Sequence, residues 1–189
     1  DRSKIAELGK ELFGESYMLF DKDVRDKFND RGFLRGYKIF LQGVISRFED
    51  RMEMFGLSAC RYIEENGLHE EDFKGGKRSF INYFYKLRDK SLDKIPDSVR
   101  KAIDNLDEWV TKKHDSSIRM LIEHIYPELN TNLRESVEYY DENLRNYVSA
   151  VLLSKNLYQL GILNDLYGEV RDYCDEKGLM LLSDTTRLL

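Results

Sequence analysis

Hydrophobic residues recur at three- and four-residue spacing along most of the chain, a pattern that predicts helices. The longest such run extends from Phe33 to Asn66 and ends at the turn signal Asn66-Gly67. If unbroken, it forms an amphipathic helix about 50 Å long at 1.5 Å per residue. Its apolar stripe consists of Phe33, Tyr37, Phe40, Leu41, Val44, Ile45, Phe48, Met52 and Phe55.

A second long helix is predicted from Leu129 to Lys177, with Gly178 as its stop. A shorter helix is expected to open at Asp115, and Pro127 is expected to mark a restart or a kink between the two. The apolar stripe of the shorter helix is Ile118, Leu121, Ile122 and Ile125. That of the long one is Leu133, Val137, Tyr140, Leu144, Tyr147, Val148, Val151 and Leu152.

Between the two long runs the pattern breaks into short pieces. A single helical turn is expected at 68–73, a loop at 74–77, a helix capped by Ser79 through about Asp89, and another helix after Pro96. Residues 3–14 also read as a helix, and Val24 and Phe28 suggest a short one. The prediction is an all-α fold in which two long antiparallel helices flank an insert of short helices, residues 68–113.

The final residues suggest that the chain is a fragment of a larger protein. After Gly178 come an apolar run, residues 179–182, and a one-turn helix start at Ser183 or Asp184, too short to pack alone. The chain begins with Asp1, without a signal peptide. We therefore expect a helical subdomain over 1–178 and a truncated segment over 179–189.

Composition fits a folded domain without a membrane span. Of 189 residues 41% are hydrophobic and 34% are charged, and only two are proline. No apolar run approaches the roughly 20 residues that cross a bilayer. Cys60 and Cys174 match no metal-ligand spacing, and without a secretion signal free thiols are favoured over a disulfide. This predicts a cytoplasmic protein.

Charge is distributed unevenly along the chain. The net charge is −5, but residues 74–101 hold nine basic and three acidic residues, whereas residues 123–178 hold eleven acidic and five basic ones. Basic side chains near aromatic ones can bind nucleic acid, although the cations could equally be solvated and Phe80 and Phe84 are expected in the core. The candidate DNA-contacting residues are Lys74, Lys77, Arg78, Lys86, Arg88, Lys112 and Lys113.

The residues offer no catalytic, metal or cofactor site. The segment Gly75-Gly76-Lys77-Arg78-Ser79 lacks the first glycine and the preceding strand of a phosphate loop. The three histidines, His69, His114 and His124, have no partner at ligand spacing. No serine or cysteine sits in a nucleophile motif. The single tryptophan, Trp109, is predicted to be a packing anchor.

Several sequence segments, taken in their order along the chain, resemble segments of one protein family. They are Gly67 to Gly75, Ser79 to Leu87, Asp107-Glu108-Trp109, Ile125 to Asn130, and Leu157 to Leu189. Together they look like the 1B region of RecB-like, UvrD-type superfamily 1 DNA helicases, particularly the helicase–exonuclease forms of Bacteroides-type bacteria. The resemblance covers nearly the whole chain.

The resemblance implies a DNA-side accessory subdomain whose parent enzyme binds ATP and magnesium in a separate motor domain. No ATPase or nuclease residue of that family maps onto this chain, and 179–189 resembles the segment that re-enters the motor. Expected partners are duplex or forked DNA, the motor domain and a partner subunit. The alternative is a helical protein–protein interaction module that does not bind DNA.

Overall fold

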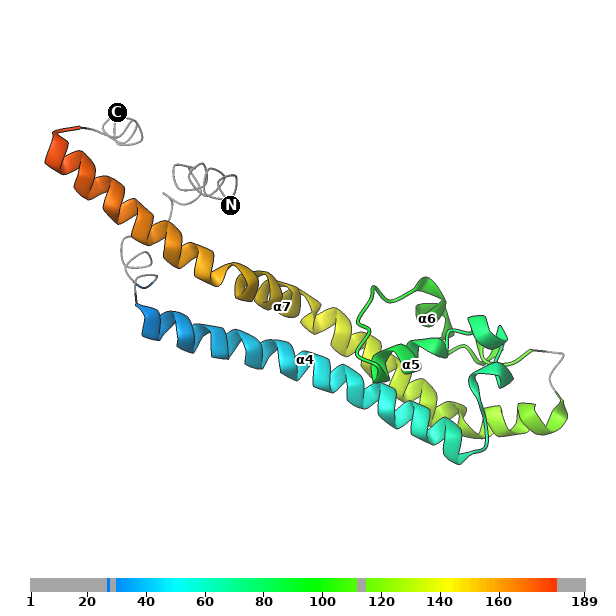
Figure 1. Cartoon of the computed structure of the whole chain (residues 1–189). Helices are drawn as coiled ribbons and strands as arrows, with labels where there is room; N and C mark the ends of the chain where they lie inside the picture. Colours follow the sequence, from blue (N-terminus) through cyan, green and yellow to red (C-terminus); the bar gives the residue numbers. More distant parts are fainter. Residues whose placement is uncertain (1–26, 28–29, 112–114, 180–189) are drawn as a thin grey trace. The chain divides into compact units, whose positions relative to one another are not determined.

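The computed structural model describes residue 27, residues 30–111 and residues 115–179. Over these residues the chain contains helices and no strands, which confirms the all-α prediction (Figure 1). The predicted helix at 3–14, Val24 and Phe28, and residues 180–189 lie outside the described residues. The α-helices are α4 (Arg31–Glu65), α5 (Asn82–Arg88), α6 (Asp97–Ala102) and α7 (Ser116–Lys177), and the 3₁₀ turns are η1 (Glu70–Asp72), η2 (Gly76–Arg78) and η3 (Leu106–Glu108).

Helix α4 matches the first long run to within two residues at its start. The Asp30 carboxylate caps it by accepting from the amides of Gly32 at 2.7 Å and Phe33 at 3.1 Å. At the other end Gly67 has φ +69°, and the Leu68 amide donates to the Ile63 carbonyl oxygen at 3.1 Å. This is the left-handed C-terminal stop expected of a glycine.

Helix α7 joins two segments that the sequence predicts as separate helices. Of the two predicted outcomes at Pro127, a restart or a kink, the restart is wrong, because the helix continues through this residue. The missing N–H costs one hydrogen bond, but the residues around it are fixed by burial: Ile122, Ile125 and Leu129 are each at most 1% exposed. Tertiary packing here outweighs the local preference. Gly178, with φ +62°, ends the helix as predicted.

The chain divides into two compact units, Val44–Ser149 and the pair of segments Asp1–Gly43 and Ala150–Leu189. Within Val44–Ser149, α4 and α7 run antiparallel: Phe48 stacks on Tyr147 at 4.5 Å between ring centroids, whereas Phe55, further along α4, meets Tyr139 at 6.2 Å, earlier in α7. The main hydrophobic core lies in this unit, and residues of α5, α6 and the segments around the 3₁₀ turns contribute to it.

The second unit is described over 30–43 and 150–179. Leu34, Leu41, Ala150 and Leu157 are buried there, and the Lys38 ammonium lies 4.6 Å from the centre of the Tyr158 ring. The predicted stripe of α4 is not buried throughout, since Phe40 is 59% exposed.

Candidate nucleic-acid interface

The aromatic residues of the basic insert (residues 68–113) form its core. Trp109 is fully buried and meets three rings edge-on, at centroid distances of 6.3 Å to Phe73, 4.8 Å to Phe80 and 5.3 Å to Tyr126. Phe84 is also fully buried. The predicted packing roles of Trp109, Phe80 and Phe84 are therefore confirmed, and these rings are not available to stack on bases.

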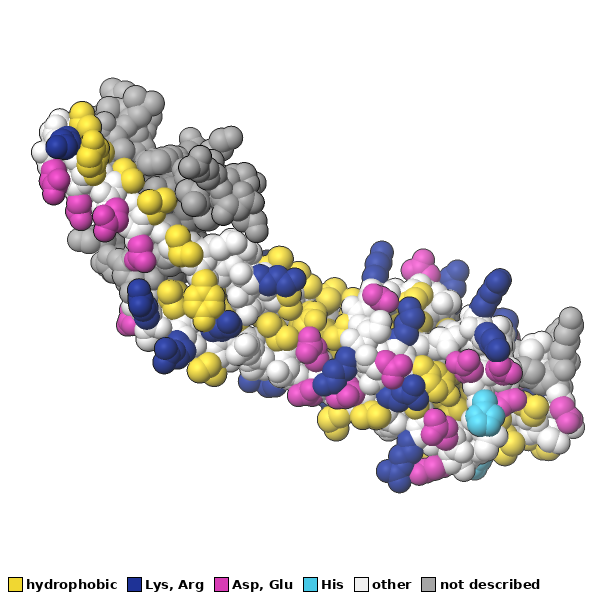
Figure 2. Space-filling view, viewed as in Figure 1, with side chains coloured by type: hydrophobic (Ala, Val, Ile, Leu, Met, Phe, Trp, Pro, Cys, Tyr) yellow, Lys and Arg dark blue, Asp and Glu magenta, His cyan; other side chains and the backbone are white. Residues whose placement is uncertain are grey.

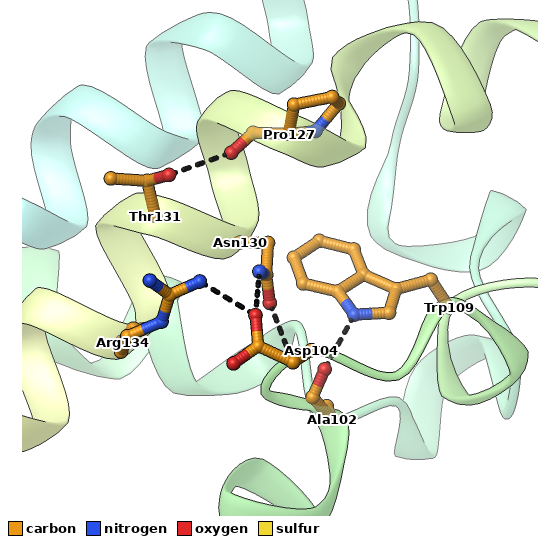
Figure 3. Close-up of polar contacts among 7 residues, drawn as sticks. All are labelled: Ala102, Asp104, Trp109, Pro127, Asn130, Thr131 and Arg134. Carbon is orange, nitrogen blue, oxygen red and sulfur yellow. Dashed lines mark hydrogen bonds and ion pairs between the residues drawn. The ribbon is translucent and has the colours of Figure 1, made fainter.

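Polar contacts fix the insert to α7 (Figure 3). The Trp109 Nε1 donates to the Ala102 carbonyl oxygen at 2.9 Å. Asp104 has φ +57°, and its amide donates to Asn130 Oδ1 at 2.8 Å while its carboxylate accepts from Asn130 Nδ2 at 2.7 Å and Arg134 at 2.6 Å. We call Asp104, Asn130 and Arg134 the latch. It holds the turn after α6 in an unfavourable backbone conformation against a long helix.

Six of the nine basic residues in 74–101 pair with carboxylates. Lys74 contacts Glu108, Lys77 contacts Glu71, Lys86 contacts Asp93, Arg88 contacts Asp89, Lys90 contacts Asp50 and Glu53, and Arg100 contacts Asp141. Two of these six cations, Lys90 and Arg100, pair with acids on the long helices α4 and α7. The cationic surplus seen along the sequence is thus partly neutralised in space.

Three cations of this segment, Arg78, Lys94 and Lys101, form no ion pair with any described residue. All three are exposed. Figure 2 shows Lys and Arg side chains interspersed with acidic ones over the region of α5 and α6. The predicted contacts Lys112 and Lys113, like His114, lie outside the described residues.

A cleft of about 240 Å³ lies between the η2–α5 segment and residues 91–99. Two of the unpaired cations, Arg78 and Lys94, line it, together with Lys86. Of the sequence-predicted contacts, therefore, the structure brings together Arg78 and Lys86. We call this the basic cleft.

The other predicted contacts that the structure describes, Lys74, Lys77 and Arg88, pair with carboxylates of the same segment. The Lys74 ammonium donates to the Asp107 carbonyl oxygen and to Glu108, both at 2.9 Å, and so ties the 74–77 loop to η3. The Arg88 guanidinium lies 5.1 Å from the centre of the Tyr85 ring and pairs with Asp89 at 3.0 Å. Lys77, although 79% exposed, pairs with Glu71 at 3.3 Å. None of the three lines the basic cleft.

Burial and pairing shift several pKa values in this unit. Burial raises the pKa of the Cys60 thiol to about 11 and that of the Tyr83 hydroxyl to about 12. The hydrogen bond from Asn130 lowers the pKa of the Asp104 carboxyl, and Arg100 lowers the pKa of Asp141. These shifts are explained by packing and ion pairing, and none of them marks an acid–base centre.

The described residues contain no group of three or more His, Cys, Asp or Glu side chains placed to hold a metal ion. His69 and His124 are both exposed. Both cysteines are free thiols, as predicted; Cys60 is buried and Cys174 is half-buried.

Sequence reasoning missed Lys94 as a member of the site. Lys94 is separated from α5 by an irregular segment, and only the return of the chain toward α5 brings it near Arg78. The turn that causes this return begins at Lys90, a non-glycine residue with φ +55°. A lysine in a left-handed conformation has no sequence signature.

No protein-family model, curated protein or solved structure was found to match the chain. Over the part of the chain that the structure describes, every helix is too short or too polar to cross a bilayer.

Proposed function

We propose that this chain is an accessory subdomain of an ATP-dependent DNA helicase or helicase–exonuclease and that it guides duplex or forked DNA through phosphate contacts. ATP and Mg²⁺ would bind the motor domain of the parent enzyme, which would hydrolyse the ATP. This chain would hold the DNA in position. An enzyme of this class in bacteria works in the cytoplasm.

The observation that carries the proposal is the convergence of Arg78, Lys86 and Lys94 on the basic cleft. Side chains that bind phosphates need no particular base sequence, and their affinity falls with salt because counterions are released. The resemblance of the sequence segments to 1B regions supports the same proposal.

Titration of the whole chain with labelled forked DNA at low salt tests the proposal. We expect the triple variant Arg78→Ala, Lys86→Ala, Lys94→Ala to bind about tenfold more weakly, and its salt slope to be shallower by about one for each phosphate that it no longer neutralises. The control triple variant Arg47→Ala, Arg145→Ala, Lys155→Ala removes the same charge from exposed positions on α4 and α7. Equal weakening by both variants, or no binding by the unaltered chain, contradicts the proposal.

A protein–protein interaction module is the second candidate, and exposed apolar side chains favour it. In the unit formed by 30–43 and 150–179, Ile39 is 64% exposed, Phe40 59%, and Leu152 and Ile162 56% each. Apolar side chains gathered on a surface mark interfaces more often than single exposed ones do. The absence of DNA affinity, together with self-association that disappears when Ile39 and Phe40 are changed to Ser, would favour this candidate.

A further inference from the structure

The basic cleft has the chemistry of a nucleotide site as well as that of a charged surface. Its cations come from both walls, Arg78 and Lys86 from the η2–α5 segment and Lys94 from residues 91–99, and its lining also includes the buried apolar residues Phe80, Tyr83 and Val99, which we call its floor. A surface that only attracts phosphates needs no such floor. A nucleotide carries both groups, a charged phosphate and a sugar with an apolar face.

The cations of the cleft are free to accept an anion. Arg78 and Lys94 have no carboxylate partner among the described residues. Lys86 is held only loosely, since its ammonium lies 3.4 Å from Asp93 Oδ2, longer than the 2.7–2.9 Å usual for charge-assisted hydrogen bonds. All three side chains can therefore turn toward a bound phosphate without breaking a strong pair.

Neutral hydrogen-bonding groups complete the lining. Ser79, Asn82, Ser91 and Ser98 line the cleft. The Asn82 amide donates to the Lys77 carbonyl oxygen at 2.8 Å, and the Ser91 hydroxyl donates to Asp93 Oδ2 at 3.4 Å. Ser79 is 5% exposed and its Oγ accepts from the Ile81 amide at 3.3 Å, which leaves its hydroxyl proton available. Hydroxyl and amide groups can donate to phosphate oxygens or pair with sugar hydroxyls.

The walls are held in place before any ligand binds. The Ser91 amide donates to the Lys86 carbonyl oxygen at 2.8 Å, and the Lys90 ammonium contacts Asp50 and Glu53 of α4 at 3.1 Å each. Ile95, 2% exposed, anchors the far wall in the core. A preformed site loses little conformational entropy on binding.

We propose that the basic cleft binds one nucleotide unit, with the phosphate on Arg78 and Lys94 and the sugar on the apolar floor. The proposal rests on the proposed function and deepens it by naming the part of DNA that this unit holds. The same chemistry would also bind a free nucleotide, so the two sources must be separated by experiment.

The first arm uses the whole chain and three small probes: thymidine 5′-monophosphate, thymidine and inorganic phosphate. Binding is read from NMR chemical shifts of the backbone amides of 78–99 and of the Asn82 side-chain amide. We expect the monophosphate to shift these signals, with thymidine at least tenfold weaker and inorganic phosphate intermediate. Equal binding of phosphate and monophosphate, or shifts located elsewhere, would overturn the proposal.

Substitutions in the basic cleft test whether the monophosphate binds there. Arg78→Ala with Lys94→Ala should weaken monophosphate binding at least tenfold, whereas the control pair Arg47→Ala with Arg145→Ala should leave it unchanged. Asp93→Asn removes the single carboxylate that lines the cleft among the described residues and releases Lys86, so it should tighten binding about threefold. Unchanged or weaker binding by Asp93→Asn, with the amide spectrum intact, contradicts the proposed phosphate position.

The second arm separates this inference from the proposed function. Forked DNA that binds the chain and is displaced by the monophosphate from the basic cleft supports both. DNA binding that is weakened by the Arg78, Lys86, Lys94 triple variant but is not displaced by the monophosphate sinks the inference and leaves the proposed function standing. Monophosphate binding without DNA binding sinks the proposed function and identifies the ligand as a free nucleotide.

Discussion

Gly56 and Gly36 lie in the same helix, α4, but only Gly56 faces another backbone. A Cβ at Gly56 would overlap the amide nitrogen of Arg88 and would lie 2.6 Å from the Phe84 carbonyl oxygen. A Cβ at Gly36 would meet nothing within 4 Å. The absence of a side chain at Gly56 therefore allows α5 to pack directly on α4.

The two glycines make a matched pair for measurement. Gly56→Ala should lower the free energy of unfolding by about 1–3 kcal/mol, because α5 must move away from α4. Gly36→Ala should raise it by up to about 1 kcal/mol, because alanine is the better helix former and the site is open. Urea denaturation followed by circular dichroism measures both. A stabilised Gly56→Ala variant would show that α5 does not approach α4 so closely.

At the scale of elements, helix α7 contains a residue that disfavours helical structure, Pro127. Pro127 cannot donate to the Glu123 carbonyl oxygen, and proline inside a helix costs about 3 kcal/mol relative to alanine. Core contacts of the neighbouring residues offset that cost. Pro127→Ala should therefore raise the free energy of unfolding by about 1–3 kcal/mol, measured by urea denaturation. A loss of stability would mean that the proline ring makes packing contacts worth more than the missing hydrogen bond.

The latch and the Arg100–Asp141 pair join the insert to α7 and should make stability depend on acid. Both carboxyl pKa values are lowered in the folded state. Their contribution is then fully present above the unfolded value of about 4 and is lost as pH falls through the lower folded values. We expect the double variant Asp104→Asn, Asp141→Asn to flatten the decline in unfolding free energy below about pH 4. An unchanged slope would show that other carboxyls dominate acid unfolding.

Over the whole molecule, the uneven charge along the sequence overstates the charge available to a partner. Three of the nine cations in 74–101 lack an ion pair among the described residues, and Lys86, whose ammonium lies 3.4 Å from Asp93, is a fourth that can reach a phosphate. At about 0.9 per neutralised phosphate, the salt slope that these cations give with forked DNA should lie at about −3 to −4. A slope of about −8 or steeper would show that the internal pairs open when DNA binds.

The ends of the long helices were predictable because apolar spacing, caps and stops are local signals, as at Asp115 and Gly178. The continuity of α7 through Pro127 and the start of α5 at Asn82, without the predicted Ser79 cap, were not predicted. The basic cleft was only half predictable: Arg78 and Lys86 follow from charge and position. Lys94 comes close to Arg78 and Lys86 only because the chain turns at Lys90, which has a left-handed backbone conformation. Lys74 instead donates a hydrogen bond to the Asp107 carbonyl oxygen. Both outcomes depend on contacts between residues distant in sequence, which local patterns do not encode.

The single, fully buried Trp109 also makes the molecule its own optical probe. Its indole is enclosed by Phe73, Phe80 and Tyr126, so its emission should be shifted to the blue and quenched slowly by acrylamide. Far-ultraviolet dichroism, by contrast, reports mainly the long helices. Recording both signals during one melt would show whether the insert and the long helices lose their structure together or one before the other.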